Sequence, residues 1–195
     1  MHVIDFPVDA SAYAKEVLDR RDFWIYRDPF FTIGAGSYLD EPKEYYTMAP
    51  ITNSMLSECV GDIYKPLMET LGQHLSCPVI MLPEAAIPGI HIFNHQCNGR
   101  DGHEHIDTPY QKVFWPEPFS NPFSFTVVMQ LPECGGGLIT GDDYTPYEVN
   151  KMYIHSGLKS HRIANKEDVE EDEYRITLQG HGAFLQFSKQ VAIYF

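Results

Sequence analysis

The sequence predicts a mainly β protein in which N-terminal helices buttress one face of a jelly roll or β-barrel. Three observations support this fold class. From residue 78 onward, short apolar and aromatic runs alternate with Gly, Pro, Asn and Asp, which is typical of many short strands. Before that point, two segments carry apolar residues at helical spacing. Twelve Tyr and twelve Phe residues further favour a β-rich interior.

The first predicted helix covers residues 9–21, where apolar residues recur at helical spacing. Asp9 or Ser11 is expected to cap its N-terminus, because short polar side chains accept hydrogen bonds from the first free N–H groups of a helix. Residues 22–33 then look strand-like, with Pro29 as an interruption.

The second predicted helix covers about residues 56–75, with apolar residues every three or four positions. Thr52 or Asn53 is expected to cap it, and residues 40–42 (DEP) before it are expected to form a turn. Pro66 falls inside the segment, and an interior proline costs about 3 kcal/mol. We therefore expect a bend or two shorter helices.

The strand candidates lie between residues 78 and 187, separated by turn residues. The Gly135–Gly137 run between two of them is expected to form a tight turn or bulge. The candidates are PVIML (78–82), GIHIFNH (89–95), TPYQKVFW (108–115), FSFTVVMQL (123–131), GLIT (137–140), KMYIHS (151–156), LKSHRIA (158–164), YRITLQG (174–180) and AFLQF (183–187).

Length and charge narrow the class of protein. A chain of 195 residues is expected to form one domain. Its net charge of −13 and its lack of a basic run argue against nucleic acid as a partner. No apolar run approaches the roughly 18 residues of a membrane helix, and no signal peptide is visible. Four scattered cysteines without a C-x-x-C pair indicate a reduced, cytoplasmic protein. The oligomeric state is left open.

Five residues in a fixed order are the strongest functional signal. Because side chains alternate along a strand, His105 and Asp107 would share one face. With His161, they would supply the two imidazoles and one carboxylate that bind Fe(II) on one side and leave other positions open. Arg175 and Thr177 would likewise share a face, and a guanidinium suits a planar carboxylate. The set therefore predicts an iron site beside a slot for an acid.

The order of these residues resembles that of the iron(II)/2-oxoglutarate-dependent oxygenases. Two neighbouring stretches add to the resemblance: FSFTVVMQLPECGGGLI (123–139) is similar to the family's strand, turn and Gly-Gly-x-Leu sequence, and YIHSGLKSHRI (153–163) to the stretch with the distal His. The resemblance covers about residues 88–187. It implies a double-stranded β-helix (a jelly roll) in residues 88–195, on which a helical and extended part, residues 1–87, would pack within the same domain.

The resemblance also implies an activity. His105, Asp107 and His161 would bind Fe(II), and the far carboxylate of the cosubstrate 2-oxoglutarate would pair with Arg175, helped by Thr177. With O2, the enzyme would hydroxylate a C–H bond of a small polar metabolite, such as a free amino acid or derivative, and release succinate and CO2. The carboxylate of Asp107 favours hydroxylation over halogenation, whereas desaturation and ring closure stay open.

Two other classes of function stay open. A cupin-type isomerase or dioxygenase without 2-oxoglutarate would use His103 and His105, and its later motif is partly echoed by Gly157, His161 and Asn165. That site gives no role to the later arginine and lacks its expected Glu. The other alternative is a ligand-binding β-barrel without catalysis. Metal content would separate it from the two enzymes, and dependence on 2-oxoglutarate would separate the enzymes from each other.

Other roles for individual residues are also open. His155 is the rival for the distal metal ligand, and His91 and His95 are candidates for hydrogen bonds around the site. His181 is expected to be structural or on the surface. An acidic segment, residues 167–173 (EDVEEDE), is expected to be a solvated loop. In the alternative interpretation, Arg175 is only the surface ion-pair partner of this loop, a contact worth about 0–1 kcal/mol.

Overall fold

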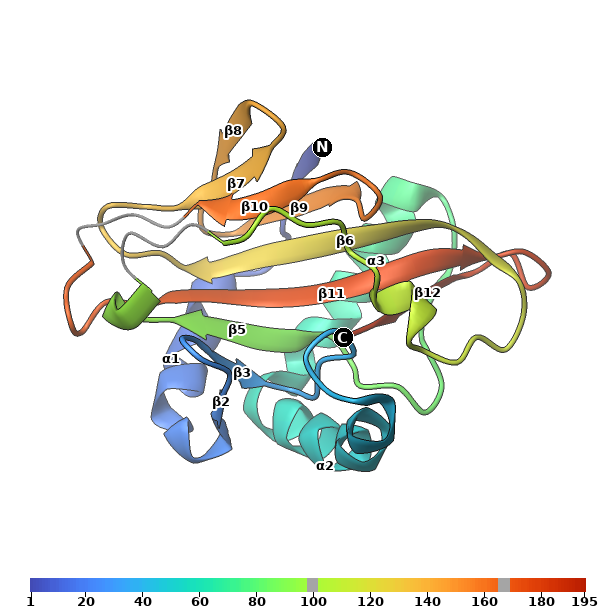
Figure 1. The fold of residues 1–195 in the computed structure, drawn as a ribbon, viewed down its shortest axis with the longest axis horizontal. Coiled ribbons are helices and arrows are strands. Elements are labelled where there is room, and N and C mark those ends of the chain that lie inside the picture. Colours follow the sequence, from blue (N-terminus) through green and yellow to red (C-terminus); the bar gives the residue numbers. More distant parts are fainter. Residues whose placement is uncertain (98–101, 165–168) are drawn as a thin grey trace.

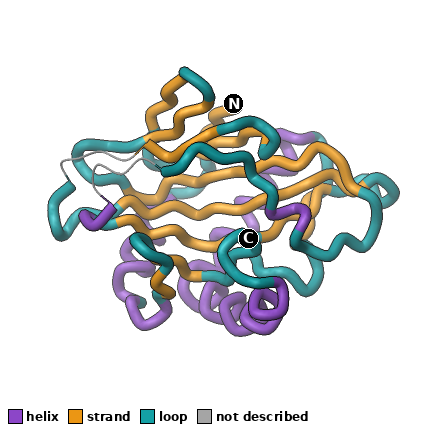
Figure 2. Tube along the Cα trace, viewed as in Figure 1, coloured by secondary structure: helices purple, strands orange, loops and turns teal. Residues whose placement is uncertain are grey.

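The computed structural model describes residues 1–97, 102–164 and 169–195. The fold is mainly β, with the α-helices gathered along one side of the strands (Figures 1 and 2). The helices are α1 (Ala10–Asp19), α2 (Pro42–Val60), α3 (Tyr64–Leu75) and the short 3-10 turns η1 (Arg21–Phe23), η2 (Gly61–Ile63), η3 (His95–Cys97) and η4 (Pro109–Gln111). The strands are β1 (His2–Asp5), β2 (Ile25–Tyr26), β3 (Phe31–Ile33), β4 (Val79–Met81), β5 (Gly89–Phe93), β6 (Phe119–Gln130), β7 (Gly137–Thr140), β8 (Asp143–Pro146), β9 (Lys151–Ser156), β10 (His161–Ala164), β11 (Arg175–Leu185) and β12 (Val191–Tyr194).

The described strands form two sheets. The large sheet has the order β1-β9-β6-β11-β5-β3-β2, with β12 pairing with β11 and β4 pairing with β12. The small sheet has the order β10-β7-β8. Apart from the parallel pair of β12 and β4, the pairs between these strands are antiparallel. The long strands β6 and β11 run through the middle of the large sheet (Figure 1).

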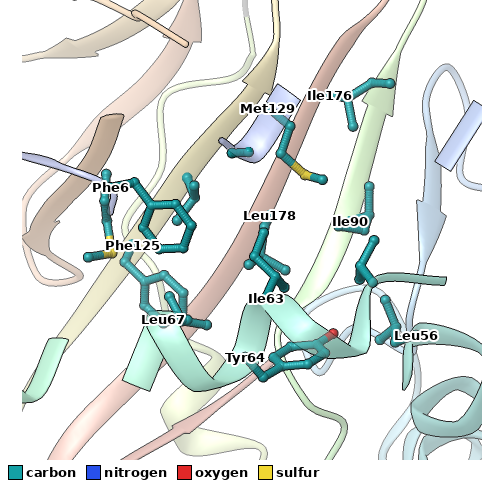
Figure 3. Close-up of a cluster of buried hydrophobic side chains, with 14 of the residues drawn as sticks. Phe6, Leu56, Ile63, Tyr64, Leu67, Ile90, Phe125, Met129, Ile176 and Leu178 are labelled. Atoms are coloured by element: carbon teal, nitrogen blue, oxygen red, sulfur yellow. The ribbon is translucent and has the colours of Figure 1, made fainter. Parts of the chain in front are cut away.

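The two faces of the large sheet differ in polarity. One face is apolar and packs against the helices: Figure 3 shows Ile63 and Leu67 pointing toward Leu178 and Phe125 of the sheet. Residues directly opposite each other on neighbouring strands share a face, and the register places a set of polar residues together on the other face. This set is His91 on β5, Ser124 and Thr126 on β6, His155 on β9, and Thr177, Gln179 and His181 on β11.

The first helix is confirmed, with Asp9 as its cap: the carboxylate accepts a hydrogen bond from the Ser11 N–H. The predicted start of the second helix is wrong. Helix α2 begins at Pro42, where a fixed φ suits a first helical position, so Thr52 and Asn53 lie inside the helix rather than at its cap. The predicted division into two helices is confirmed, but the break falls at η2. Pro66 is tolerated because it lies in the first turn of α3.

Two predictions in the β region are wrong. The segment 108–115 is not a strand: it contains η4, and Trp115 stacks on Phe119 in a side cluster of the core. The candidates 174–180 and 183–187 are parts of the single strand β11. Gly180 and Gly182 between them do not end the strand, because they make room for aromatic rings: a Cβ on Gly180 would lie 2.6 Å from Cζ of Phe125.

The apolar face of the sheet should carry much of the stability. Leu178 is fully buried in the middle of β11, and replacing it with alanine should lower the free energy of unfolding by about 2–5 kcal/mol. Chemical denaturation followed by circular dichroism would measure the change. Leu158→Ala is the matched control, because Leu158 is 53% exposed and its loss should cost no more than about 0.5 kcal/mol. Equal losses in both variants would contradict this account of the core.

None of the helices in the described parts of the chain combines the length and apolar character needed to cross a membrane.

Candidate metal centre

Three side chains that could ligate a metal meet at one point. His105, Asp107 and His161 each offer an atom that lies within 4.8 Å of the others. Nε2 of His105 is 3.6 Å from Oδ1 of Asp107, and Nε2 of His161 is 3.4 Å from Oδ2. Two imidazole nitrogens and a carboxylate are the donor set of a facial Fe(II) site, so the residues present fit the predicted metal.

Backbone pairing holds two of these residues opposite each other. His105 and His161 form an isolated antiparallel bridge, in which each N–H donates to the carbonyl of the other at 2.9 Å. The N–H of Asp107 donates to the carbonyl of Gly157 at 2.9 Å. The expectation that His105 and Asp107 lie on a regular strand is therefore wrong in detail. The segment is extended and attached to the edge strand β10, and His105 and Asp107 still face the same point.

Hydrogen bonds fix the tautomers of both histidines. Nδ1 of His105 donates to the carbonyl of His103 at 2.7 Å, and Nδ1 of His161 donates to the carbonyl of Lys159 at 2.9 Å. In the neutral imidazole this places the lone pair on Nε2, the ring nitrogen that faces Asp107 in both histidines. Metal-binding histidines are commonly held in this way, with the other ring nitrogen bonded to a backbone carbonyl.

The carboxylate of Asp107 is supported from the large sheet. Ser124 Oγ donates a short hydrogen bond to Oδ2 and lies 2.9 Å from Nδ1 of His181. Burial raises the pKa of Asp107, but the interaction with His105 and the fields of His181 and His161 lower it by more, so the net pKa lies below its usual range. The group is therefore a carboxylate at neutral pH, which is the form that binds metal.

Sequence analysis missed Ser124, and it treated His181 as structural or surface without placing it near the cluster, where it contacts Ser124. His181 reaches the site because it lies six positions after Arg175 on the same strand, and alternate residues share a face. This period of two was the available signal. Gly180 and Gly182, on either side of His181, concealed this signal, because glycines suggested that the strand had ended.

Arg175 and Thr177 share a face of β11, as expected from their spacing, and both are buried. The three guanidinium nitrogens and the Thr177 hydroxyl have no hydrogen-bond partner among the described residues. The guanidinium lies over the ring of Phe93, with Cζ 3.9 Å from the ring centre. Burial lowers the pKa of Arg175 to about 10, which leaves it cationic at neutral pH. A buried cation without a partner is costly, so this arrangement fits a site for a ligand anion.

The acidic segment does not supply that anion within the described residues. Of the predicted segment 167–173, residues 167 and 168 lie outside the described part of the chain. The next residues form a loop in which Glu170, Glu171 and Asp172 are exposed. Glu173 accepts hydrogen bonds from the N–H groups of Glu133 and Glu170 instead.

The other histidines take different positions. His155 is buried on β9 with its ring centre 4.4 Å from that of His161, and burial lowers its pKa to about 4, so it packs as a neutral ring. It is not one of the three clustered residues. His103 is exposed, and Asn165, which the cupin alternative would use, lies outside the described residues. His91 contacts Tyr38.

Comparison with known proteins shows the fold. No family model matches the chain, and no curated protein matches it. Among solved structures, an N-substituted L-amino acid dioxygenase from Burkholderia ambifaria AMMD is 11% identical with a TM-score of 0.58, covering 99% of this chain and 85% of its own. The structure of such an enzyme in complex with alpha-KG is 12% identical, with the same TM-score and coverage. KdgF from Halomonas sp. is 11% identical and has a TM-score of only 0.30, over 51% of this chain and 69% of its own. The chain thus has a fold that a dioxygenase also has.

Proposed function

We propose that this protein is an Fe(II)/2-oxoglutarate-dependent oxygenase that hydroxylates a C–H bond of a small polar metabolite, such as a free amino acid or derivative. One observation carries the proposal. The cluster of His105, Asp107 and His161 accompanies a buried cation, Arg175, that has no hydrogen-bond partner among the described residues and lies on the polar face of the sheet that supports Asp107. A metal site alone would suit several classes of enzyme, whereas a metal site with a separate slot for a carboxylate suits a 2-oxo dicarboxylate.

We also propose that residues 88–195 form a double-stranded β-helix, on which residues 1–87 pack in a single domain. The path of the chain supports this interpretation. It alternates between the sheets: β5 and β6 belong to the large sheet, β7 and β8 to the small one, β9 to the large, β10 to the small and β11 to the large. Between β5 and β6, the chain also pairs with the small sheet, through the bridge between His105 and His161 of β10.

The side chains have distinct roles in this proposal. His105, Asp107 and His161 would hold Fe(II), which together with 2-oxoglutarate and O2 supplies hydroxylation coupled to release of succinate and CO2. The backbone bonds to each Nδ1 keep both imidazoles in the ligating tautomer. Arg175 and Thr177 would anchor the far carboxylate of 2-oxoglutarate by charge-assisted hydrogen bonds. Both side chains are buried, and exclusion of water strengthens such bonds.

The proposed substrate class rests on the comparison with solved structures and on the charge of the chain. A protein of similar fold is an N-substituted L-amino acid dioxygenase, and a second structure of such an enzyme is a complex with alpha-KG, which is 2-oxoglutarate. The net charge of −13 does not suit nucleic acid. No disulfide joins the four cysteines, all of which lie in the described part of the chain, in keeping with the proposed cytoplasmic location.

The cupin alternative receives less support. Its first ligand, His103, is exposed and is not among the residues whose ligand atoms cluster. It also leaves the buried guanidinium of Arg175 without a function. The experiment that separates the two is anaerobic visible spectroscopy of the protein with Fe(II), to which 2-oxoglutarate is added. A new broad charge-transfer band supports the proposal; bound iron without a band favours the cupin alternative.

The hydroxyl of Ser124 should matter for metal affinity. Ser124→Ala removes the donor to Asp107, and loss of such a supporting residue typically weakens metal binding 10- to 100-fold. Titration of the apo protein with Mn(II), a redox-stable substitute for Fe(II), would measure the change. Ser120→Ala is the matched control, because Ser120 lies on the same strand opposite Phe184, away from the metal cluster. Equal affinities for the two variants would show that the hydrogen bond does not support the site.

A further inference from the structure

A third buried polar group lies next to Arg175 and Thr177. His91 is the direct partner of Thr177 in the register between β5 and β11, so the two side chains share a face with Cβ atoms about 4.5–5.5 Å apart. His91 is 4% exposed, and its Nδ1 is buried without a hydrogen-bond partner among the described residues. Unsatisfied polar atoms of three neighbouring residues thus gather on one face of the sheet.

The protonation state of His91 follows from its contact with Tyr38. The phenol oxygen of Tyr38 forms a short hydrogen bond with Nε2 of His91. Burial raises the pKa of Tyr38 well above its usual value, so the phenol keeps its proton. Burial lowers the pKa of His91 to about 3, with Arg175 acting in the same direction, so the imidazole is neutral. The phenol therefore donates to Nε2, and the single ring proton of His91 lies on Nδ1.

The loop that carries Tyr38 is held in place by a partly buried ion pair. The guanidinium of Arg27 donates to both carboxylate oxygens of Asp40, at 2.5 and 3.0 Å. Asp40 also accepts a hydrogen bond from the N–H of Gly36 at 2.9 Å, and the N–H of Ser37 donates to the carbonyl of Phe195. These bonds fix the backbone on both sides of Tyr38, so the orientation of His91 is set before any ligand binds.

Aromatic rings enclose the imidazole. Phe30 stacks on Phe93 with ring centres 5.0 Å apart, and both rings contact His91, as does Phe195. The same Phe93 lies under the guanidinium of Arg175. The Nδ1–H donor and the cation therefore share one apolar wall, where a hydrogen bond to a charged acceptor is stronger than in water.

We propose that His91, oriented by Tyr38, donates its Nδ1–H to the same ligand carboxylate that Arg175 and Thr177 bind. The inference rests on the proposed function, in which this carboxylate is the far end of 2-oxoglutarate. One rival acceptor exists inside the protein. Gln179 lies on the same face of β11, and a hydrogen bond from its side chain acts to raise the pKa of His91, so its amide oxygen competes with a ligand for Nδ1. If Gln179 holds Nδ1, His91 would shape the core and contribute nothing to ligand affinity.

The test compares two ligands and three proteins. Anaerobic Fe(II) protein is titrated with 2-oxoglutarate and with pyruvate, a 2-oxo acid without a far carboxylate, for the wild type, His91→Phe and His91→Asn. Phenylalanine keeps the ring contacts but has no donor, so the Kd for 2-oxoglutarate should rise about 10- to 100-fold while that for pyruvate stays unchanged. Asparagine places an amide N–H near the position of Nδ1. His91→Asn should therefore raise the Kd for 2-oxoglutarate by no more than half as much as His91→Phe, on a logarithmic scale.

The outcomes separate the two proposals. A wild-type protein that gives no band with 2-oxoglutarate would overturn the proposed function itself. A wild-type band with an unchanged Kd in His91→Phe would overturn only the role of His91, as would an equal loss for both ligands or an asparagine variant no better than phenylalanine. If His91→Phe does not fold, NMR of Zn(II)-loaded wild type labelled with 15N-histidine replaces it. The His91 Nδ1–H signal should then shift with 2-oxoglutarate and not with pyruvate, and a signal that stays in place would overturn the role.

Discussion

Asp107→Ala should abolish turnover of 2-oxoglutarate and lower the affinity for Fe(II) more than about 100-fold. Loss of a residue that only supports a ligand already costs 10- to 100-fold, and Asp107 is the anionic member of the cluster. Its removal also leaves the hydroxyl of Ser124 without its acceptor. Release of succinate would measure turnover, and titration with Mn(II) would measure affinity for metal.

His103→Ala is the matched control for Asp107→Ala. His103 is exposed and contributes only its backbone carbonyl, which accepts from His105 and is present in the alanine variant. Turnover should therefore persist. Undiminished turnover in Asp107→Ala would end the assignment of the metal site, and loss of activity in His103→Ala alone would support the cupin alternative.

Arg175→Met should weaken the binding of 2-oxoglutarate strongly. Truncation of one member of a buried, hydrogen-bonded charge pair typically costs about 2–5 kcal/mol, or roughly 30- to 5,000-fold in Kd. The anaerobic charge-transfer band, titrated with 2-oxoglutarate, gives the Kd. Arg20→Met is the control, because Arg20 lies at the surface beside Glu58 and should leave the Kd unchanged.

The same variant should not destabilise the ligand-free protein. Burial lowers the pKa of Arg175 to about 10, so the unfolded chain holds this proton more tightly than the folded one. The burial penalty therefore opposes folding throughout the neutral range, and an apolar side chain of similar length removes it. The Tm of Arg175→Met should stay equal or rise. A lower Tm with an unchanged Kd would show that Arg175 is a structural residue.

Much of the β region could be predicted because strands and turns leave local signals. The continuity of β11 could not. In the sequence, Gly180 and Gly182 suggest the end of a strand. In the structure they are required, because the rings of Phe125 and Phe123 on β6 pack against them. That requirement depends on a strand more than 50 positions away along the chain (180 − 125 = 55). The start of α2 was also missed. The helix begins at Pro42, and a search for apolar residues at helical spacing does not reveal a proline as the first helical residue.

In the candidate site, too, local patterns could be predicted from the sequence and contacts between distant segments could not. The pairs at spacing i and i+2 were visible in the sequence, and the structure places each pair toward one region, although their roles stay predictions. The supporting residues were visible only in part. His91 was a candidate for a hydrogen bond near the site, but Ser124 was not, and the positions of both depend on the pairing of β5 and β6 with β11. Cross-strand neighbours have no fixed separation in sequence. The tautomers of the histidines likewise depend on backbone carbonyls that only the folded chain positions.

The opposite polarity of the two sheet faces makes β11 intolerant of changes in length. Ile176 and Leu178 pack toward the helices, whereas Arg175 and Thr177 alternate with them on the polar face. A slip of one residue would exchange the two sets and bury the guanidinium in the apolar core. The apolar core and the proposed ligand site therefore require the same register. Insertions and deletions should be confined to the loop before residue 175, whose length affects the free energy of the fold only weakly, so relatives of this protein should differ in that loop and keep the length of the strand.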